Sequence, residues 1–142
     1  MKEYTTYSEA ETRALGEKLA GLLRPGDVVA YRGGLGAGKT AFTRGLAKGL
    51  GLPDEVSSPT FALVHEYRGT GPTLYHFDLY RITGFEDLES TGYFDYLEAG
   101  GILAVEWSEN ALEALPPETI TIDIQRVDDT TRRITVEGDD RF

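Results

Sequence analysis

The sequence predicts an α/β fold built around a mixed sheet, and three observations lead to this prediction. Short apolar runs typical of strands alternate with segments of helical periodicity along most of the chain. Two neighbouring strand-like runs, 61–67 and 73–80, are joined by the turn sequence 68-RGTGP-72, which predicts an antiparallel hairpin. A glycine-rich loop, 33-GGLGAGKT-40, separates a buried strand from a helix. We therefore expect a mostly parallel central sheet, helices flanking it and one antiparallel hairpin.

The first part of the chain is predicted to run helix, strand, helix. Residues 8-SEAE-11 form a capping-box pattern, and apolar residues then recur at helical spacing until the turn signal 24-RPGD-27. Residues 27–32 are apolar and partly β-branched, as in a buried strand. A second helix is expected from Lys39 to about Leu50, where glycine and proline end it.

The second part of the chain continues the alternation after a loop at 54–60 and the hairpin. One or two short helices are expected over 84–99. An apolar strand over 101–107 carries a carboxylate near its end, and a short helix near 108–115 follows it. The last two strands are expected at 118–125 and 132–137.

Length and charge limit the functions that are open to this protein. The chain has 142 residues and no dividing linker, so we expect one domain over 1–142. Fourteen basic and twenty-four acidic side chains give a net charge of −10, which disfavours direct binding to RNA or DNA. The same acidity suits either simple solubility or a basic partner surface. The absence of cysteine excludes disulfides and thiolate zinc sites, and no apolar run suggests a membrane span or signal peptide; we expect a cytoplasmic protein.

The glycine-rich loop matches the Walker A pattern G-x-x-x-x-G-K-[ST] in full. Consecutive backbone N–H groups in such a loop curl around phosphates, and side chains larger than hydrogen would block this approach. Lys39 is expected to reach the β- and γ-phosphates, and the Thr40 hydroxyl to bind Mg²⁺. A strand precedes the loop and a helix follows it, which is the context that the motif requires. The sequence therefore predicts a P-loop nucleotide site.

Hydrolysis needs further groups, and three candidates lie at strand ends or in a loop. Asp78 and Glu106 each follow an apolar run, so either can hold the metal directly or through water. Thr60, in 58-SPT-60, lies where a nucleotide-sensing switch loop is expected. His65 and His76 do not have the spacing of metal ligands, and we interpret them as polar residues of a sheet without a catalytic role.

Some expected motifs are absent from the sequence. It contains no guanine-reading N-K-x-D motif, no arginine-rich lid and no arginine obviously placed as a finger. The pattern favours a slow ATPase that needs a partner. Two alternatives stay open: a small-molecule kinase, and a nucleotide-gated protein-binding module that does not turn over its ATP.

Taken together, four motifs resemble those of the bacterial TsaE (YjeE) ATPases. They are GGLGAGKT, 57-SSPTF-61, 76-HFDLYR-81 and 105-VEW-107, in this order over nearly the whole chain. The resemblance implies a P-loop ATPase that is required for threonylcarbamoyladenosine modification of adenosine 37 in tRNA. It implies ATP/ADP and Mg²⁺ as cofactors and a TsaD–TsaB heterodimer as the activating partner, which itself handles the tRNA.

The resemblance also assigns roles to individual residues. It makes Thr40 and Glu106 the magnesium ligands, Thr60 the switch threonine and Asp78 a Walker-B-like carboxylate, so that the catalytic set is Lys39, Asp78, Glu106 and Thr60. The remaining nucleotide contacts are expected around the loop, near the N-terminus and at a C-terminal arginine (Arg132 or Arg133): Gly33, Leu35, Gly36, Ala37, Gly38, Lys39, Thr40, Ala41, Ser8 and Arg133. Many members of the family carry a second threonine where this chain has Ala41.

Overall fold

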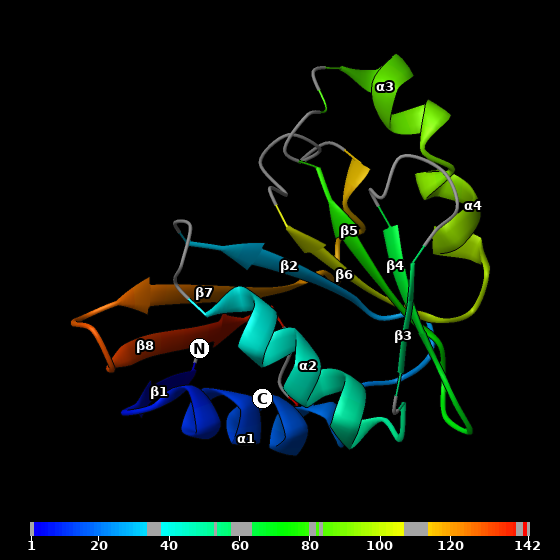
Figure 1. The fold of residues 1–142 in the computed structure, drawn as a ribbon. Helices are drawn as coiled ribbons and strands as arrows, with labels where there is room; N and C mark the ends of the chain where they lie inside the picture. Colours follow the sequence, from blue (N-terminus) through cyan, green and yellow to red (C-terminus); the bar gives the residue numbers. More distant parts are fainter. Residues whose placement is uncertain are drawn as a thin grey trace.

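The computed structural model describes residues 2–33, 38–52, 54–57, 64–79, 82, 84–106, 114–138 and 141, with no description of the side chains at 54–57 and 85. Within these residues the chain forms one sheet and four helices (Figure 1). The strands are β1 (Lys2–Thr6), β2 (Val28–Arg32), β3 (Asp54–Ser57), β4 (Val64–Arg68), β5 (Leu74–Asp78), β6 (Ile102–Glu106), β7 (Ile120–Arg126) and β8 (Arg132–Glu137).

The helices confirm the sequence-based assignments. They are α1 (Glu9–Ala20), α2 (Lys39–Gly49), α3 (Phe85–Ser90) and α4 (Tyr93–Glu98). The predicted cap of α1 is present, because Ser8 Oγ accepts a hydrogen bond from the Glu11 N–H at 3.0 Å. Glu11 in turn accepts from the backbone N–H of Tyr7 at 2.9 Å. No helix in the described part of the chain is long and apolar enough to span a bilayer.

The sheet has eight strands in the order β1-β8-β7-β2-β6-β5-β4-β3. The central strands β7, β2, β6 and β5 pair in parallel, whereas every pairing toward the two edges is antiparallel. The predicted α/β class, the mostly parallel centre and the β4–β5 hairpin are therefore confirmed. Because parallel strands present their carboxyl ends at one edge, the ends of β2, β5 and β6 lie together there.

Two strands were absent from the sequence-based prediction. Residues 54–57, expected in a loop, form the edge strand β3 against β4, and Lys2–Thr6 form β1 against β8. Both are short and lie at the sheet's edges, where pairing with a neighbour's backbone decides the conformation more than hydrophobic alternation does. The short helix expected near 108–115 falls mostly outside the described residues.

The sheet separates two hydrophobic layers, and both cover the central strands. Helices α1 and α2 lie over one face, where Tyr31, Phe42 and Ala104 belong to one buried cluster. Helices α3 and α4 lie over the other, where Phe77 and Tyr93 belong to a second cluster. Figure 1 shows the two helix pairs on opposite sides of the sheet. Coverage on both faces explains why β2 and β6 are continuous apolar runs.

Helices α1 and α2 approach each other closely enough for their backbones to touch. A Cβ added at Gly45 would lie 2.0 Å from the Arg13 carbonyl oxygen, and one at Gly16 would lie 2.4 Å from that of Phe42. Real Cβ atoms do not tolerate such distances, so glycine is required at both crossing points. This contact fixes α2 on the sheet and places its first turn over the carboxyl edge of the parallel strands.

Candidate nucleotide-binding site

The first turn of α2 has the features of an anion-binding helix terminus. Gly38, the N-cap, has φ +108° and makes no side-chain cap, and no acidic residue lies in the first turn. Gly33, at the start of the loop, has φ +124°, and a Cβ there would meet the Ile124 carbonyl oxygen at 2.1 Å. Free N–H groups at a helix N-terminus favour a negatively charged ligand. Glycine is thus required at 33 and 38 by the backbone conformation, and at 33 also by the close Ile124 carbonyl; a role of these glycines toward phosphate stays a prediction.

A cavity of about 610 Å³ opens beside this helix start, and we call it the nucleotide cavity. It collects side chains from α1, α2, the ends of β5 and β6, and the turn between β7 and β8. Its lining residues are Ser8, Glu9, Thr12, Gly38, Lys39, Thr40, Ala41, Arg44, Asp78, Glu106, Asp129, Thr130 and Arg132. Seven of the predicted site residues are among them, and so is Arg132, the alternative to Arg133: the seven are Ser8, Gly38, Lys39, Thr40, Ala41, Asp78 and Glu106.

The other predicted site residues either lie outside the described part of the chain or do not line the nucleotide cavity. Thr60, Leu35, Gly36 and Ala37 lie outside the described residues, so their roles stay predictions. Gly33 does not line the nucleotide cavity itself, but its carbonyl oxygen accepts a hydrogen bond from Lys39 Nζ at 3.0 Å. This contact holds the Lys39 ammonium, whose side chain is almost fully buried, at the mouth of the loop.

The two predicted carboxylates are brought together by strand register. Asp78 and Glu106 are direct partners in the parallel pairing of β5 with β6, so both side chains leave the same face at the same edge. That face is the one covered by α2, whose first residues include Thr40. A hydroxyl and two carboxylates from three separate elements therefore line the same cavity.

Glu106 has a neighbour that sequence reasoning missed. His76 Nε2 lies 3.2 Å from Glu106 Oε2, and both side chains are largely buried. Burial alone would raise the pKa of Glu106, but His76, Lys39 and His65 together outweigh that effect and hold the pKa below its ordinary value. Glu106 is thus an anion at neutral pH, as a metal ligand must be. The signal for His76 was its place two residues before Asp78, on the same face of one strand.

A buried polar contact ties the floor of the site to α2. Thr43 Oγ1 lies 2.8 Å from both the Tyr31 hydroxyl and the Lys39 carbonyl oxygen. A hydroxyl has one hydrogen and a carbonyl can only accept, so Thr43 donates to Lys39 and Tyr31 donates to Thr43. Burial raises the pKa of Tyr31 far above its ordinary value, which keeps this phenol protonated as the donor. The contact anchors the first turn of α2 to β2.

The C-terminal hairpin contributes a wall that the sequence did not predict in detail. Of the two adjacent arginines, Arg132 lines the nucleotide cavity, whereas Arg133 Nε lies 3.7 Å from Glu3 Oε1. The geometry therefore favours Arg132 over Arg133, the residue chosen from the sequence, as the one near a nucleotide. The Arg132 guanidinium donates to the carbonyls of Asp128 and Thr131.

Arg44 is the second arginine that the fold brings to this cavity. The sequence analysis named no arginine of α2 as a nucleotide contact. Arg44 lies one turn beyond Lys39 on α2, and nothing in the sequence distinguishes it from other surface cations of that helix. Asp129 and Thr130 were missed for a related reason, because only the sheet order reveals that the β7–β8 turn lies next to α2.

Comparison with known proteins places the chain in a family context. A family model described as Threonylcarbamoyl adenosine biosynthesis protein TsaE matches residues 6–134. Curated relatives with the description tRNA threonylcarbamoyladenosine biosynthesis protein TsaE match most of the chain. The protein from Bacillus subtilis (strain 168) is 41% identical over 133 residues, which cover 94% of this chain and 83% of that protein. The protein from Aquifex aeolicus (strain VF5) is 41% identical over 138 residues, or 96% of each chain.

A solved structure has a similar fold. The crystal structure of Bacillus subtilis YdiB matches with a TM-score of 0.77 and 36% sequence identity. The match covers 99% of this chain and 88% of that one, so it includes the strands and helices that build the nucleotide cavity.

Proposed function

Because the chain belongs to the TsaE family of threonylcarbamoyl adenosine biosynthesis proteins, we propose that it binds and hydrolyses ATP in support of this tRNA modification at adenosine 37. A TsaD–TsaB heterodimer is the proposed activating partner, and the tRNA is reached only through that complex. One observation is the main support for the ATP site: Lys39 and Thr40 at the start of α2 share a cavity with Asp78 and Glu106 at the ends of β5 and β6.

The nucleotide cavity has groups suited to both ends of ATP. The start of α2 offers backbone N–H groups and the Lys39 ammonium, which suit the phosphates. Ser8, Thr12 and Thr130 line other parts of the same cavity, and we place the nucleoside against them. A volume of about 610 Å³ lies within the range typical of small-ligand sites, about 300–1,000 Å³.

The donor set fits magnesium. Thr40 and Glu106 are the proposed ligands, and Asp78 acts directly or through water; all supply oxygen, the donor that Mg²⁺ prefers. Among the described residues, no group of three or more His, Asp or Glu side chains could hold a metal ion by itself. This agrees with Mg²⁺, which usually takes one or two carboxylates and completes its shell with phosphates and water. Bound magnesium would neutralise charge on the outer phosphates during hydrolysis.

Slow turnover without a partner is part of the proposal. Arg132 is held by two carbonyl oxygens of its own hairpin, so that its guanidinium is engaged there. A partner that supplies or redirects a cation toward the γ-phosphate can raise the rate of hydrolysis by about 10³–10⁵ in related enzymes.

Phosphate release, measured with and without purified TsaD–TsaB, tests the proposal. We expect slow release from the protein alone, stimulation by the heterodimer and no stimulation of Lys39→Ala. Glu106→Ala should keep nucleotide binding better than hydrolysis, and Lys18→Ala, an exposed cation of α1, serves as the control. Binding of ATP without release under any condition would indicate a nucleotide-gated module, and transfer of phosphate to an added metabolite would indicate a kinase.

A further inference from the structure

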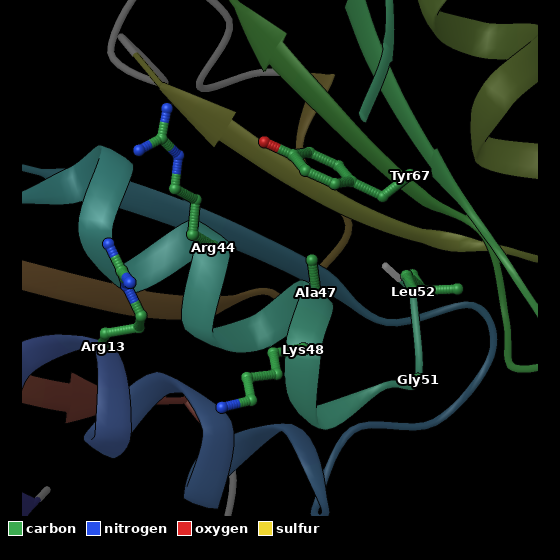
Figure 2. Close-up of a pocket in the computed structure, with 7 residues that line it drawn as sticks. All are labelled: Arg13, Arg44, Ala47, Lys48, Gly51, Leu52 and Tyr67. Carbon is green, nitrogen blue, oxygen red and sulfur yellow. The ribbon is translucent and has the colours of Figure 1, made fainter. Parts of the chain in front are cut away.

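A second hollow lies on the α1–α2 side of the sheet and shares Arg44 with the nucleotide cavity. It has a volume of about 650 Å³ and lies between α1, α2, the turn after α2 and β4 (Figure 2). Its lining residues are Arg13, Arg44, Ala47, Lys48, Gly51, Leu52 and Tyr67, and we call it the cationic groove. Three of these residues are cations, and none of the described lining residues is acidic.

The cations of the groove are poorly neutralised within the chain. Arg13 lies 3.5 Å from Glu9 and Lys48 lies 3.8 Å from Glu17, both as exposed pairs near the outer limit of an ion pair. Exposed pairs of this kind stabilise little. Arg44 is exposed and makes no ion pair with any described residue.

Arg13 adds a second, independent sign of a missing partner. Its Nε is buried and makes no hydrogen bond within the described part of the chain. A buried donor without a partner is costly, so a ligand that lets the Arg13 side chain turn its Nε toward an acceptor would be favoured. Figure 2 shows Arg44 and the hydroxyl end of Tyr67 extending toward the same side of the groove, above α2.

We infer that the cationic groove is a docking site for an acidic segment of a partner protein, one that presents aspartate or glutamate side chains. Guanidinium groups bind carboxylates through paired, charge-assisted hydrogen bonds. Ala47, Leu52 and the Tyr67 ring supply apolar surface for the aliphatic stems of such side chains.

Charge favours an acidic protein segment over RNA as the occupant. A nucleic acid brings a charge at every phosphate, and its binding needs cations that follow the backbone. This chain carries a net charge of −10, and Glu9 and Glu17 stand beside the groove's own cations. A short acidic peptide segment brings few charges, so three cations can match it and it meets less repulsion from the field of the whole molecule than a nucleic acid does.

Arg44 connects this groove to the nucleotide cavity, and a coupling between the two rests on the proposed function. Arg44 lines both the cationic groove and the nucleotide cavity. An acidic side chain that draws the Arg44 guanidinium into the groove changes the charge that faces the nucleotide. Docking and nucleotide binding are then coupled, and each must alter the affinity of the other by the same factor.

The first experiment uses defined probes and does not depend on the proposed function. Backbone NMR shifts of the full-length protein are followed during titration with an oligoglutamate peptide and, separately, with an oligouridylate RNA of matched charge. We expect the peptide to shift Ala47, Gly51 and Leu52 selectively, and the RNA to leave them unshifted. Selective shifts with the RNA, or no selective shift with the peptide, would overturn the inference.

The second experiment tests the groove with the proposed partner. Binding to purified TsaD–TsaB is measured for Lys48→Glu, for Arg13→Glu and for Lys18→Glu, which changes the same charge elsewhere on α1. We expect about 10-fold weaker binding for the two groove variants and a change below about 2-fold for Lys18→Glu. Urea unfolding checks that each variant is folded. If Arg13→Glu does not fold, Lys48→Glu carries the test, because the Lys48 side chain is 70% exposed.

The two proposals fail in different ways. If the wild type binds TsaD–TsaB and Lys48→Glu binds equally well, the docking inference is wrong and the proposed function stands. If the wild type does not bind the heterodimer but the peptide shifts the groove selectively, the partner assignment fails and the acidic-segment inference stands.

Discussion

His76 Nε2 and Glu106 Oε2 lie 3.2 Å apart, which joins the middle of β5 to the carboxyl end of β6 inside the protein. The two side chains are 10% and 14% exposed. The distance is that of an ion pair, although Nε2 makes no hydrogen bond of good geometry within the described residues. His76 therefore contacts the carboxylate directly, and it limits the orientations that Glu106 can take toward the nucleotide cavity.

Replacing His76 should weaken the magnesium dependence of nucleotide binding. Partners that orient a metal ligand typically account for 10- to 100-fold in metal affinity or activity. We expect His76→Phe to raise the Mg²⁺ concentration needed for half-maximal ATP binding by about 10-fold. His76→Gln, which keeps a polar side chain of similar reach beside Glu106, should lose less. His65→Phe should have a smaller effect than His76→Phe, because His65 lies one strand further from Glu106. An unchanged magnesium requirement in folded His76→Phe would contradict this role.

Glu106 should make stability depend on pH in the acidic range. Its pKa in the folded protein lies below the ordinary value, because the nearby His76, Lys39 and His65 outweigh the effect of burial. A lowered folded pKa contributes stability that is fully present above the unfolded value of about 4.3 and is lost as pH falls through the folded pKa. The difference in unfolding free energy between wild type and Glu106→Gln should therefore shrink from pH 6 toward about pH 3.5. A difference that stays constant over this range would contradict the lowered pKa.

The central fold was predictable because its signals are local. The loop that ends at Lys39 and the buried runs of β2 and β6 follow directly from residue pattern. Asp78 and Glu106 were predictable for a related reason, since parallel strands share a carboxyl edge whatever their order. Arg132 and His76 depend on long-range register and sheet order, which no single segment encodes. The edge strand β3 is also set by its neighbour, because its residues carry no alternating pattern of their own.

The Lys39 side chain should strengthen the binding of nucleotides that carry outer phosphates and have little effect on those that lack them. Its ammonium is held at the loop by the Gly33 carbonyl at 3.0 Å, where a γ- or β-phosphate can replace that contact. Hydrogen bonds to charged groups contribute about 1.5–3 kcal/mol, so Lys39→Ala should weaken ATP binding by about 10- to 100-fold. AMP, which lacks the outer phosphates, should lose little affinity. Equal losses for ATP and AMP, measured by calorimetry, would show that Lys39 is structural.

Removal of the Thr43 hydroxyl should lower the unfolding free energy more than removal of the Tyr31 hydroxyl. Thr43→Val removes the hydroxyl that pairs with the buried Tyr31 hydroxyl, and loss of a buried hydrogen-bond partner costs about 1–3 kcal/mol. Tyr31→Phe leaves Thr43 still bonded to the Lys39 carbonyl, so it should cost only about 0.5–1.5 kcal/mol. The double variant should cost less than the sum of the two, because the groups interact. Urea unfolding of the three variants checks this order, and strict additivity would argue against the shared contact.

Two glycine-to-alanine changes on the α1–α2 layer should have opposite signs. At Gly45 the new methyl carbon would lie 2.0 Å from the Arg13 carbonyl oxygen, and backbone cannot rotate away as a side chain can. Alanine's better helix propensity, about 1 kcal/mol, is then outweighed by forced separation of α1 from α2. We expect Gly45→Ala to lower the unfolding free energy by about 1–3 kcal/mol.

Gly21 has φ −63°, and a Cβ there meets only the Lys18 carbonyl at 3.5 Å. Gly21→Ala should therefore stabilise by about 0.4–1 kcal/mol through the unfolded chain. Because α2 also carries Lys39 and Thr40, Gly45→Ala should weaken ATP binding as well, whereas Gly21→Ala should not; stabilisation by both changes would contradict the close helix contact.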